Sequence, residues 1–292
     1  MITVDDYIQA TFEKFQEAGI FFGHGTDNAL DEAVYLVFAT LGLDYDDGAA
    51  GSRRLSSAEI ETLNTRRLDR IESRTPMAYL VGEAWFGGRR FLADSRALIP
   101  RSPIAELLIE KSLPFLDREP ESILDLCCGG GCIGITAALE FDGACVDLAD
   151  LSAEALELAR ENVTLHGLGR EIRTLQSDLF DSIHSSYDLI LSNPPYVPAE
   201  EVAELPAEYG HEPELGLLSD DEGLAIPLRI LREAPNYLRD RGLLVLEVGH
   251  SHLQLSERLA GVPLLWLDFA YGGEGVLAIT REDLLLYRES FV

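Results

Sequence analysis

The sequence predicts an α/β protein: a small α-helical domain and a β-hairpin, then a parallel sheet with helices on both faces and a terminal antiparallel hairpin. Three observations support this fold class. From about residue 121, apolar stretches of strand length alternate with helical stretches, glycines follow the first strand, and two consecutive prolines follow the fourth. Such alternation implies a parallel sheet. The glycines and prolines therefore lie at the carboxyl ends of strands, where open α/β sheets bind ligands.

Three segments of different character divide the 292 residues. Residues 1–80 have apolar side chains at helical spacing, and Ser56 with Glu59 forms a capping box, so this segment predicts a helical domain. Residues 81–100 predict a β-hairpin connector, because aromatic residues flank a Gly-Gly turn. Residues 101–292 contain the alternating pattern and predict the domain that contains the sheet.

Within this last segment the pattern gives the order of the elements. Strands are expected at residues 123–127, 144–148, 172–176, 187–192, 243–248, 264–269 and 276–279. Helices are expected at residues 104–113, 133–139, 153–166 and 224–238. Pro227 and Pro235 predict breaks in the last helix, because proline removes a helical hydrogen bond. The final two strands flank a glycine-rich turn and are expected to pair as the closing hairpin.

The composition is acidic, with a formal net charge of −28 and only two lysines, Lys14 and Lys111. Stable binding to a nucleic-acid backbone is not expected, because it requires clustered lysine and arginine. The charge indicates a solvated acidic surface, and it also favours a basic partner. No apolar run reaches the ~18 residues that span a bilayer. The N-terminus lacks the basic start of a signal peptide, so a cytoplasmic protein is expected.

Four cysteines, Cys127, Cys128, Cys132 and Cys145, cluster near the glycines and on the next strand. They form no C-x-x-C pair, which structural zinc sites usually contain. We interpret them as small buried apolar residues and expect no metal site.

The glycine run, Gly129-Gly130-Gly131-Cys132-Ile133-Gly134, matches G-x-G-x-x-G, and Asp150 follows 21 residues after Gly129. Glycines allow a ligand to approach the backbone at a helix N-terminus, and an acid after the second strand can accept hydrogen bonds from ribose hydroxyls. Nicotinamide cofactors and S-adenosylmethionine both contain adenosine, so this motif leaves both open. Asp178 can contact an adenine amino group. The alternatives are a helix cap for Asp150 and a turn cap for Asp178.

A second motif, Asn193-Pro194-Pro195-Tyr196, ends the fourth strand. Neither proline has an N–H for the sheet, so the strand stops abruptly and the chain leaves it extended. The Asn193 amide and nearby carbonyl oxygens are then left as acceptors at the strand's carboxyl end. A stiff turn of this kind suits one task, which is to hold a planar NH2 group and fix its orientation. An ordinary Pro-Pro turn is the alternative.

Together the two motifs resemble the amino-methyltransferases that use S-adenosylmethionine, and nearly the whole chain is similar to the protein glutamine N5-methyltransferases. The resemblance implies a class I methyltransferase (Rossmann-like) sheet. The release-factor branch typically has Pro-Arg-Pro-Asp-Thr-Glu after the hairpin. Here the turn is Pro100-Arg101-Ser102-Pro103-Ile104-Ala105-Glu106. With residues 22–28 and 83–86, it is similar to the branch that methylates a glutamine of large-subunit ribosomal protein three.

This resemblance also implies roles for residues. It implies that a ribosomal protein is the substrate, and the acidic surface suits a basic protein of this kind. Residues 1–80 contain no clustered reactive groups, so we expect them to recognise the protein substrate and to take no part in the chemistry. The glutamine would be bound by Asn193, Pro194, Pro195 and Tyr196, of which Asn193, Pro194 and Tyr196 would act in catalysis by orienting the amide. S-adenosylmethionine would be bound by Cys127, Gly129, Gly130, Gly131, Asp150, Asp178, Leu179 and Asn193.

Other functions remain open on the sequence alone. A release-factor glutamine methyltransferase and a nucleic-acid amino-group methyltransferase share the Asn-Pro-Pro-Tyr turn. A nicotinamide dehydrogenase shares the glycine loop, and a ribosome-assembly factor that binds without catalysis shares the acidic surface.

Overall fold

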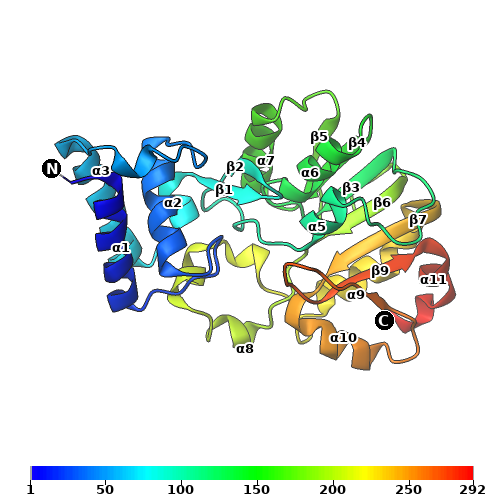
Figure 1. Cartoon of the computed structure of the whole chain (residues 1–292). Coiled ribbons are helices and arrows are strands. Elements are labelled where there is room, and N and C mark those ends of the chain that lie inside the picture. Colours follow the sequence, from blue (N-terminus) through cyan, green and yellow to red (C-terminus); the bar gives the residue numbers. More distant parts are fainter. Residues whose placement is uncertain (1, 292) are drawn as a thin grey trace.

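The computed structural model describes residues 2–291, with the helical region at one side and the sheet at the other (Figure 1). The helical region is built around an apolar core that includes Phe15, Leu36 and Leu63. Thr3 and Ser56 cap its first and third helices with capping boxes, as the sequence predicts for Ser56. Its helices are α1 (Val4–Ala18), α2 (Ala29–Leu41), α3 (Ser57–Leu68) and α4 (Met77–Val81).

A two-stranded hairpin follows, formed by β1 (Glu83–Phe86) and β2 (Arg89–Leu92), as predicted. Phe86 and Phe91 are buried in the core on one face of the large sheet. The hairpin is also tied to helix α7 (Ala153–Leu165), because the Leu92 N–H donates to Asn162 Oδ1 at 2.7 Å. The hairpin therefore packs directly on the domain that follows it.

The large sheet has seven strands in the order β5-β4-β3-β6-β7-β9-β8. Strands β3 to β7 are parallel, whereas β9 is antiparallel to β7 and to β8, as the sequence predicts. The order reverses between β3 and β6, which makes their carboxyl ends a topological switch point. The strands are β3 (Ser122–Leu126), β4 (Cys145–Asp150), β5 (Ile172–Gln176), β6 (Tyr187–Ser192), β7 (Leu238–Glu247), β8 (Leu265–Trp266) and β9 (Val276–Thr280).

Helices cover both faces of the sheet (Figure 1). Adjacent residues of β3 show the two cores: Ile123 faces one and Leu124 the other. Helices α5 (Ile104–Ile109), α6 (Cys132–Glu140) and α7 pack on the first face. Helices α9 (Ala225–Glu233), α10 (His252–Arg258) and α11 (Arg281–Leu286) pack on the second face.

Some expected boundaries are wrong. The helix at residues 104–113 ends at Ile109, because the chain turns to a φ of 51° at Lys111. The helix at residues 224–238 ends at Glu233, where Pro235 lies in a 3-10 turn. Strand β7 therefore starts earlier than residue 243. Helices α8 (Ala199–Val202), α10 and α11 were not predicted.

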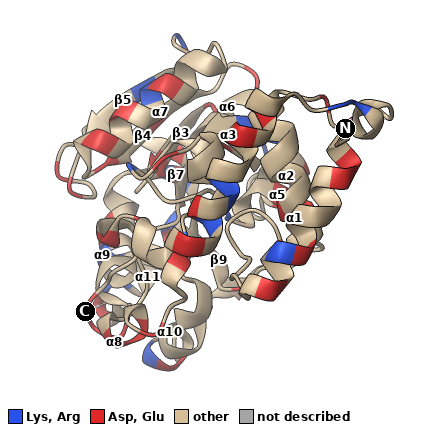
Figure 2. Ribbon diagram, turned by 90° about the vertical axis from the view of Figure 1, so that its left-hand side faces the viewer, with Lys and Arg blue, Asp and Glu red and all other residues tan. Residues whose placement is uncertain are grey.

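Acidic side chains are spread over the helices of both parts of the molecule and do not gather in one patch (Figure 2). The chain has 51 acidic and 23 basic side chains, so most of its surface repels other anions. Among residues 2–291, no helix combines the length and apolar character that crossing a bilayer requires.

Candidate active site

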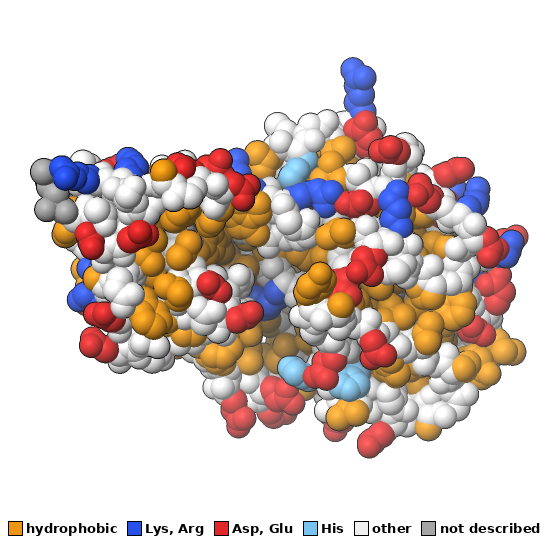
Figure 3. Space-filling model, in the orientation of Figure 1, with side chains coloured by type: hydrophobic (Ala, Val, Ile, Leu, Met, Phe, Trp, Pro, Cys, Tyr) orange, Lys and Arg blue, Asp and Glu red, His pale blue; other side chains and the backbone are white. Residues whose placement is uncertain are grey.

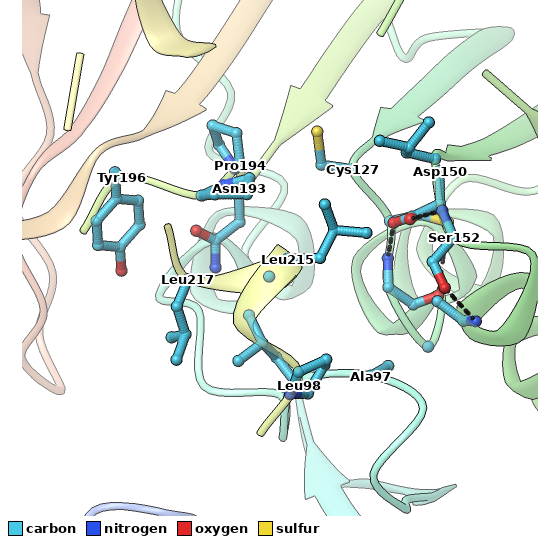
Figure 4. A pocket seen from close by; sticks show the side chains of 18 of the residues that line it. Ala97, Leu98, Cys127, Asp150, Ser152, Asn193, Pro194, Tyr196, Leu215 and Leu217 are labelled. Carbon is cyan, nitrogen blue, oxygen red and sulfur yellow. Dashed lines mark hydrogen bonds between the residues drawn. The ribbon is translucent and has the colours of Figure 1, made fainter. Parts of the chain in front are cut away.

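A cavity of about 520 Å³ opens at the carboxyl ends of β3, β4, β5 and β6 (Figure 4). Its volume is in the range of small-molecule and cofactor sites. It contains nearly all the residues that the two motifs indicate: Cys127, Gly129, Gly130, Asp150, Asp178, Leu179, Asn193, Pro194, Pro195 and Tyr196. The fold thus brings the glycine loop and the Asn-Pro-Pro-Tyr turn to one space.

Gly131 is the exception, because it does not line the cavity. It precedes α6 with a φ of 80°, and a Cβ atom there would lie 2.9 Å from Leu148 Cδ1. Its lack of a side chain therefore allows α6 to start close to β4. The N-terminus of α6 nevertheless faces the cavity, since Cys132 and Ile133 line it.

The Asp150 carboxylate organises the glycine loop. Oδ2 accepts a hydrogen bond from the Gly129 N–H at 2.8 Å, and Oδ1 accepts one from the Ser152 N–H at 2.8 Å. Burial raises the pKa of Asp150, and these backbone hydrogen bonds oppose that rise. The side chain that caps α7 is Ser152, so the helix-cap alternative for Asp150 is wrong. An ionised carboxylate can accept further hydrogen bonds, so Asp150 retains capacity for ribose hydroxyls.

Asp178 and Leu179 form the third side of the cavity, after β5. Asp178 Oδ1 accepts a hydrogen bond from Arg229 Nη1 of α9 at 2.6 Å, which fixes the carboxylate at the rim. Leu179 is buried with a φ of 45°. Cys127, also in the cavity wall, has a φ of 61°. Left-handed backbone is uncommon for residues other than glycine, and it clusters at functional sites.

The cysteines do not all have the expected surroundings. Cys128 and Cys132 are buried and Cys127 is partly buried, but Cys145 is exposed at the start of β4. Among residues 2–291, no three His, Cys, Asp or Glu side chains are placed to hold a metal ion.

The Asn-Pro-Pro-Tyr turn leaves β6 just after Ser192, whose hydroxyl donates to the Leu126 carbonyl at 2.7 Å. This bond ties the ends of β6 and β3 together. Figure 4 shows the Asn193 amide pointing into the space bounded by Tyr196 and two leucines, Leu215 and Leu217. The Asn193 side chain makes no hydrogen bond to any residue in 2–291, so its amide is available for a ligand.

Behind the turn lies a buried carboxylate that the sequence motifs did not assign to the site. Glu247, at the end of β7, accepts hydrogen bonds from the Ser102 hydroxyl and, at 3.4 Å, from the Tyr196 hydroxyl. Its side chain links the turn after the hairpin to Tyr196. Gly249 packs against the same ring, since a Cβ atom there would lie 2.6 Å from Tyr196 Cε2. Tyr196 is therefore held from two sides.

The burial of Glu247 predicts a pH dependence of stability. Burial raises its pKa to about 7, although hydrogen bonds from Ser102 and Tyr196 act to lower it. The folded chain therefore keeps a proton that the unfolded chain loses near pH ~4.3, and its free energy of unfolding falls as pH rises toward 7. We expect wild type to lose up to ~3 kcal/mol relative to Glu247→Gln between about pH 4 and 8.

Urea unfolding of both chains across this range measures the difference. Asp125, whose pKa burial also raises to about 7, titrates in both chains, so its contribution cancels. Parallel curves for wild type and Glu247→Gln would show that Glu247 titrates near its ordinary pKa.

The open side of the cavity is closed by residues 197–218, which we call the cover segment. It leaves the Asn-Pro-Pro-Tyr turn and returns beside it, where Val197 forms a bridge with Leu218. No residue of this segment other than Val197 is near a sequence motif, and none was predicted to be part of the site. Its side chains that line the cavity are Val197, Leu205, Tyr209, Pro213, Leu215, Leu217 and Leu218. These mostly apolar side chains line the space in which the Asn193 amide lies.

Two ion pairs with buried carboxylates hold the cover segment. Glu212 forms a bidentate pair with Arg101, with both N–O distances at 2.7 Å. Burial acts to raise the pKa of Glu212, but the neighbouring His24, 3.5 Å away, and the hydrogen-bonded Arg101 lower it to about 2. Glu208 pairs with Arg70 of the helical region at 2.9 Å. The helical region thus contributes directly to the position of the cover segment.

These findings fit three comparisons with known proteins. The family model "Methyltransferase small domain" matches residues 105–207. The ribosomal protein uL3 glutamine methyltransferase of Francisella tularensis is 40% identical over 99% of this chain and 93% of its own. The enzyme of that name from Xanthomonas campestris is 45% identical over 98% of this chain and 93% of its own.

Among solved structures, the hMettl16 catalytic domain in complex with a 3′UTR hairpin aligns with a TM-score of 0.50 at 16% identity. The alignment covers 84% of this chain and 88% of that one, and at this identity it supports the fold alone. The expected class I methyltransferase sheet is confirmed. With relatives this similar over nearly the full length, the chain belongs to the family of ribosomal protein uL3 glutamine methyltransferases, which use S-adenosylmethionine.

Proposed function

We propose that this chain transfers a methyl group from S-adenosylmethionine to the side-chain amide nitrogen of a glutamine in ribosomal protein uL3. One observation supports this most strongly: the Asn-Pro-Pro-Tyr turn shares a cavity with the glycine loop and Asp150. The methyl donor and the glutamine amide that accepts the methyl group can therefore bind in the same cavity. The substrate named for both relatives supports the choice of uL3.

In this proposal the cofactor lies along the glycine loop and supplies a methyl group on a positively charged sulfur. Gly129 and Gly130 let it approach the backbone at the start of α6, and Cys127 forms part of the wall. Asp150 accepts hydrogen bonds from ribose hydroxyls. Asp178 and Leu179 bind the adenine, with Asp178 held in place by Arg229. The carboxylates of Asp150 and Asp178 are hydrogen-bond acceptors, so they can bind a ligand that has hydroxyl and amino donors.

The glutamine amide would lie between Asn193 and Tyr196. Its two N–H groups donate to Asn193 Oδ1 and the Pro194 carbonyl oxygen, Pro195 keeps the turn stiff, and the Tyr196 ring packs on the flat amide. This hold favours a pyramidal nitrogen with its lone pair toward the methyl carbon. The C–N bond would form as the bond between the methyl carbon and sulfur breaks, which leaves S-adenosylhomocysteine as a neutral thioether. The nitrogen would then lose one proton to solvent. Fixed orientation can supply ~7–11 kcal/mol of such a barrier.

Recognition of the protein substrate would involve residues 1–80, with residues 81–100 as the connector and 101–292 as the catalytic domain. The acidic surface fits a basic ribosomal protein and disfavours stable nucleic-acid binding. Modification of a ribosomal protein fits a cytoplasmic enzyme.

The test in cells is mass spectrometry of ribosomal proteins from a strain that lacks this chain. We expect uL3 to lose one methyl group on a glutamine and to regain it with the wild-type chain but not with Asn193→Ala. If the Asn193→Ala chain restored uL3 methylation as well as the wild-type chain does, the Asn-Pro-Pro-Tyr turn would not be the site of methyl transfer. A release factor or an RNA that loses methylation, with uL3 unchanged, would redirect the proposal to that substrate.

For Asp150→Asn we expect an affinity for S-adenosylmethionine that is weaker by roughly 10- to 100-fold in a folded chain. An amide places an NH2 group against the N–H of Gly129 or of Ser152, so one backbone hydrogen bond is lost, and so is an acceptor for ribose. Titration calorimetry measures this affinity. Asp147→Asn is the matched control, because Asp147 lies on the same strand and pairs with Arg173 outside the cavity. Equal affinities in wild type and Asp150→Asn would exclude the ribose role.

A further inference from the structure

A second cavity, of about 430 Å³, lies between the helical region and the hairpin. His24, Tyr35, Tyr45, Asp46, Trp85 and Pro100 are in its wall. Figure 3 shows a hollow lined by hydrophobic side chains between the helical region at the left and the rest of the molecule. None of these residues has a role in the methyl transfer described above, so this cavity needs its own explanation.

Pro100 lines both cavities, and this residue makes them neighbours. A polypeptide whose glutamine enters the first cavity at Asn193 is therefore able to continue over Pro100 into the second. Pro100 also lies in the turn fixed by the Arg101–Glu212 pair, since the Ile99 N–H donates to Glu212 Oε1 at 3.0 Å. The passage between the two cavities is thus a rigid part of the fold.

The wall of the second cavity has an aromatic side. Tyr45 and Trp85 are 46% and 47% exposed, although they are among the largest side chains in the protein. They are not loose: Tyr45 stacks on Phe38 at 5.0 Å, and Trp85 meets Tyr45 edge-to-face at 5.9 Å. Rigid, exposed aromatic side chains are typical of protein-binding hot spots. Their faces also attract cations.

The same wall is acidic. Asp46 lies in it, and Asp44 and Asp47 are exposed beside it. Residues 15–52, which supply most of this wall, contain no lysine or arginine. His24 also lines the cavity, but it is 95% buried and its Nε2 atom lies 3.5 Å from Glu212 Oε2. The exposed part of this wall therefore complements a polypeptide with cationic side chains.

We propose that the second cavity binds the stretch of substrate polypeptide next to the methylated glutamine, in extended form, with a lysine or arginine side chain placed against Trp85, Tyr45 and Asp46. This proposal rests on the proposed function, and it assigns the sequence preference around the glutamine to the second cavity. An extended chain is required, because only an unfolded or looped segment can reach Asn193 under the cover segment and continue over Pro100.

The test uses steady-state methylation of purified uL3 by full-length variants. For Trp85→Ala and for Tyr45→Ala we expect the KM for uL3 to rise about tenfold, with kcat within about twofold and an unchanged affinity for S-adenosylmethionine. Phe115→Ala is the matched control, since Phe115 is 54% exposed and lines neither cavity. Wild-type KM values in folded Trp85→Ala and Tyr45→Ala chains would overturn the proposal.

A second experiment tests the charge without removing bulk. Glutamine peptides with a single lysine at successive positions on either side are compared with peptides that have alanine there. We expect wild type to prefer lysine at one or a few positions, and Asp46→Asn to lose most of that preference. Equal use of lysine and alanine peptides by wild type would overturn the cationic assignment. If wild type methylates neither uL3 nor these peptides, the proposed function itself fails.

Discussion

Asn193→Ala is expected to abolish methyl transfer and to leave most of the affinity for S-adenosylmethionine. The Asn193 amide points into the cavity and has no hydrogen-bond partner among residues 2–291, whereas the glycine loop, Asp150 and Asp178 form a separate cradle. Removing one positioned hydrogen-bonding group from an active site typically costs ~10²–10³ in rate. The loss is expected to reach at least this size, because the residues that line the cavity include no carboxylate beside Asn193 that could replace its acceptor.

Asn193→Asp tests the hydrogen bonding and charge of this side chain without a change in its size, because aspartate and asparagine have nearly the same shape. Aspartate still accepts from an N–H group, but it adds a negative charge near the sulfonium. That charge stabilises the bound cofactor more than the transition state, where the positive charge is dispersing. We expect Asn193→Asp to bind S-adenosylmethionine at least as well as wild type and to transfer methyl more slowly in single turnovers. A wild-type single-turnover rate would remove Asn193 from the mechanism.

Arg70→Met is expected to lower the free energy of unfolding by ~3–5 kcal/mol, the typical effect of breaking a buried ion pair. Arg70 is 1% exposed and pairs with Glu32 and Glu208, and its Nη2 also donates to the Phe21 carbonyl at 2.6 Å. Methionine keeps most of the volume, but it leaves the buried carboxylate of Glu32 without its cation and that of Glu208 with only Arg74, at 3.9 Å. Most of the loss therefore comes from the uncompensated charges.

Urea unfolding measures this loss, and Arg118→Met is the matched control. Arg118 is largely exposed, so its surface ion pairs are expected to contribute at most ~1 kcal/mol. Adding Glu32→Gln to Arg70→Met should recover part of the stability, because it removes one unpaired charge. An Arg70→Met chain as stable as the control would mean that the ion pair contributes little to the fold.

The parts of the site that follow strand ends could be predicted from the sequence. Glycine and proline are local signals of turns, so the turns after β3 and β6 can be recognised from the residues that form them. The parallel alternation then places both turns at one edge of the sheet, which the cavity confirms. The same motif also predicts a cofactor contact for Gly131, but it does not distinguish a glycine that lines a cavity from one whose missing side chain allows close packing on Leu148.

The cover segment could not be predicted, because its position depends on partners far away in the sequence. Glu208 and Glu212 lie 138 and 111 residues from Arg70 and Arg101. Its helical turns are short, so they have no periodicity to detect. A weak signal did exist for the buried carboxylates: Asp125 and Glu247 stand within or at the end of apolar strands, where an acid is costly unless it has partners.

The most direct test of the central claim is tandem mass spectrometry of purified uL3 after incubation with this chain and S-adenosylmethionine that has a deuterated methyl group. We expect one labelled methyl group on the side-chain nitrogen of a single glutamine, and no label with Asn193→Ala. Label on any other type of residue, or equal label with wild type and Asn193→Ala, would contradict it.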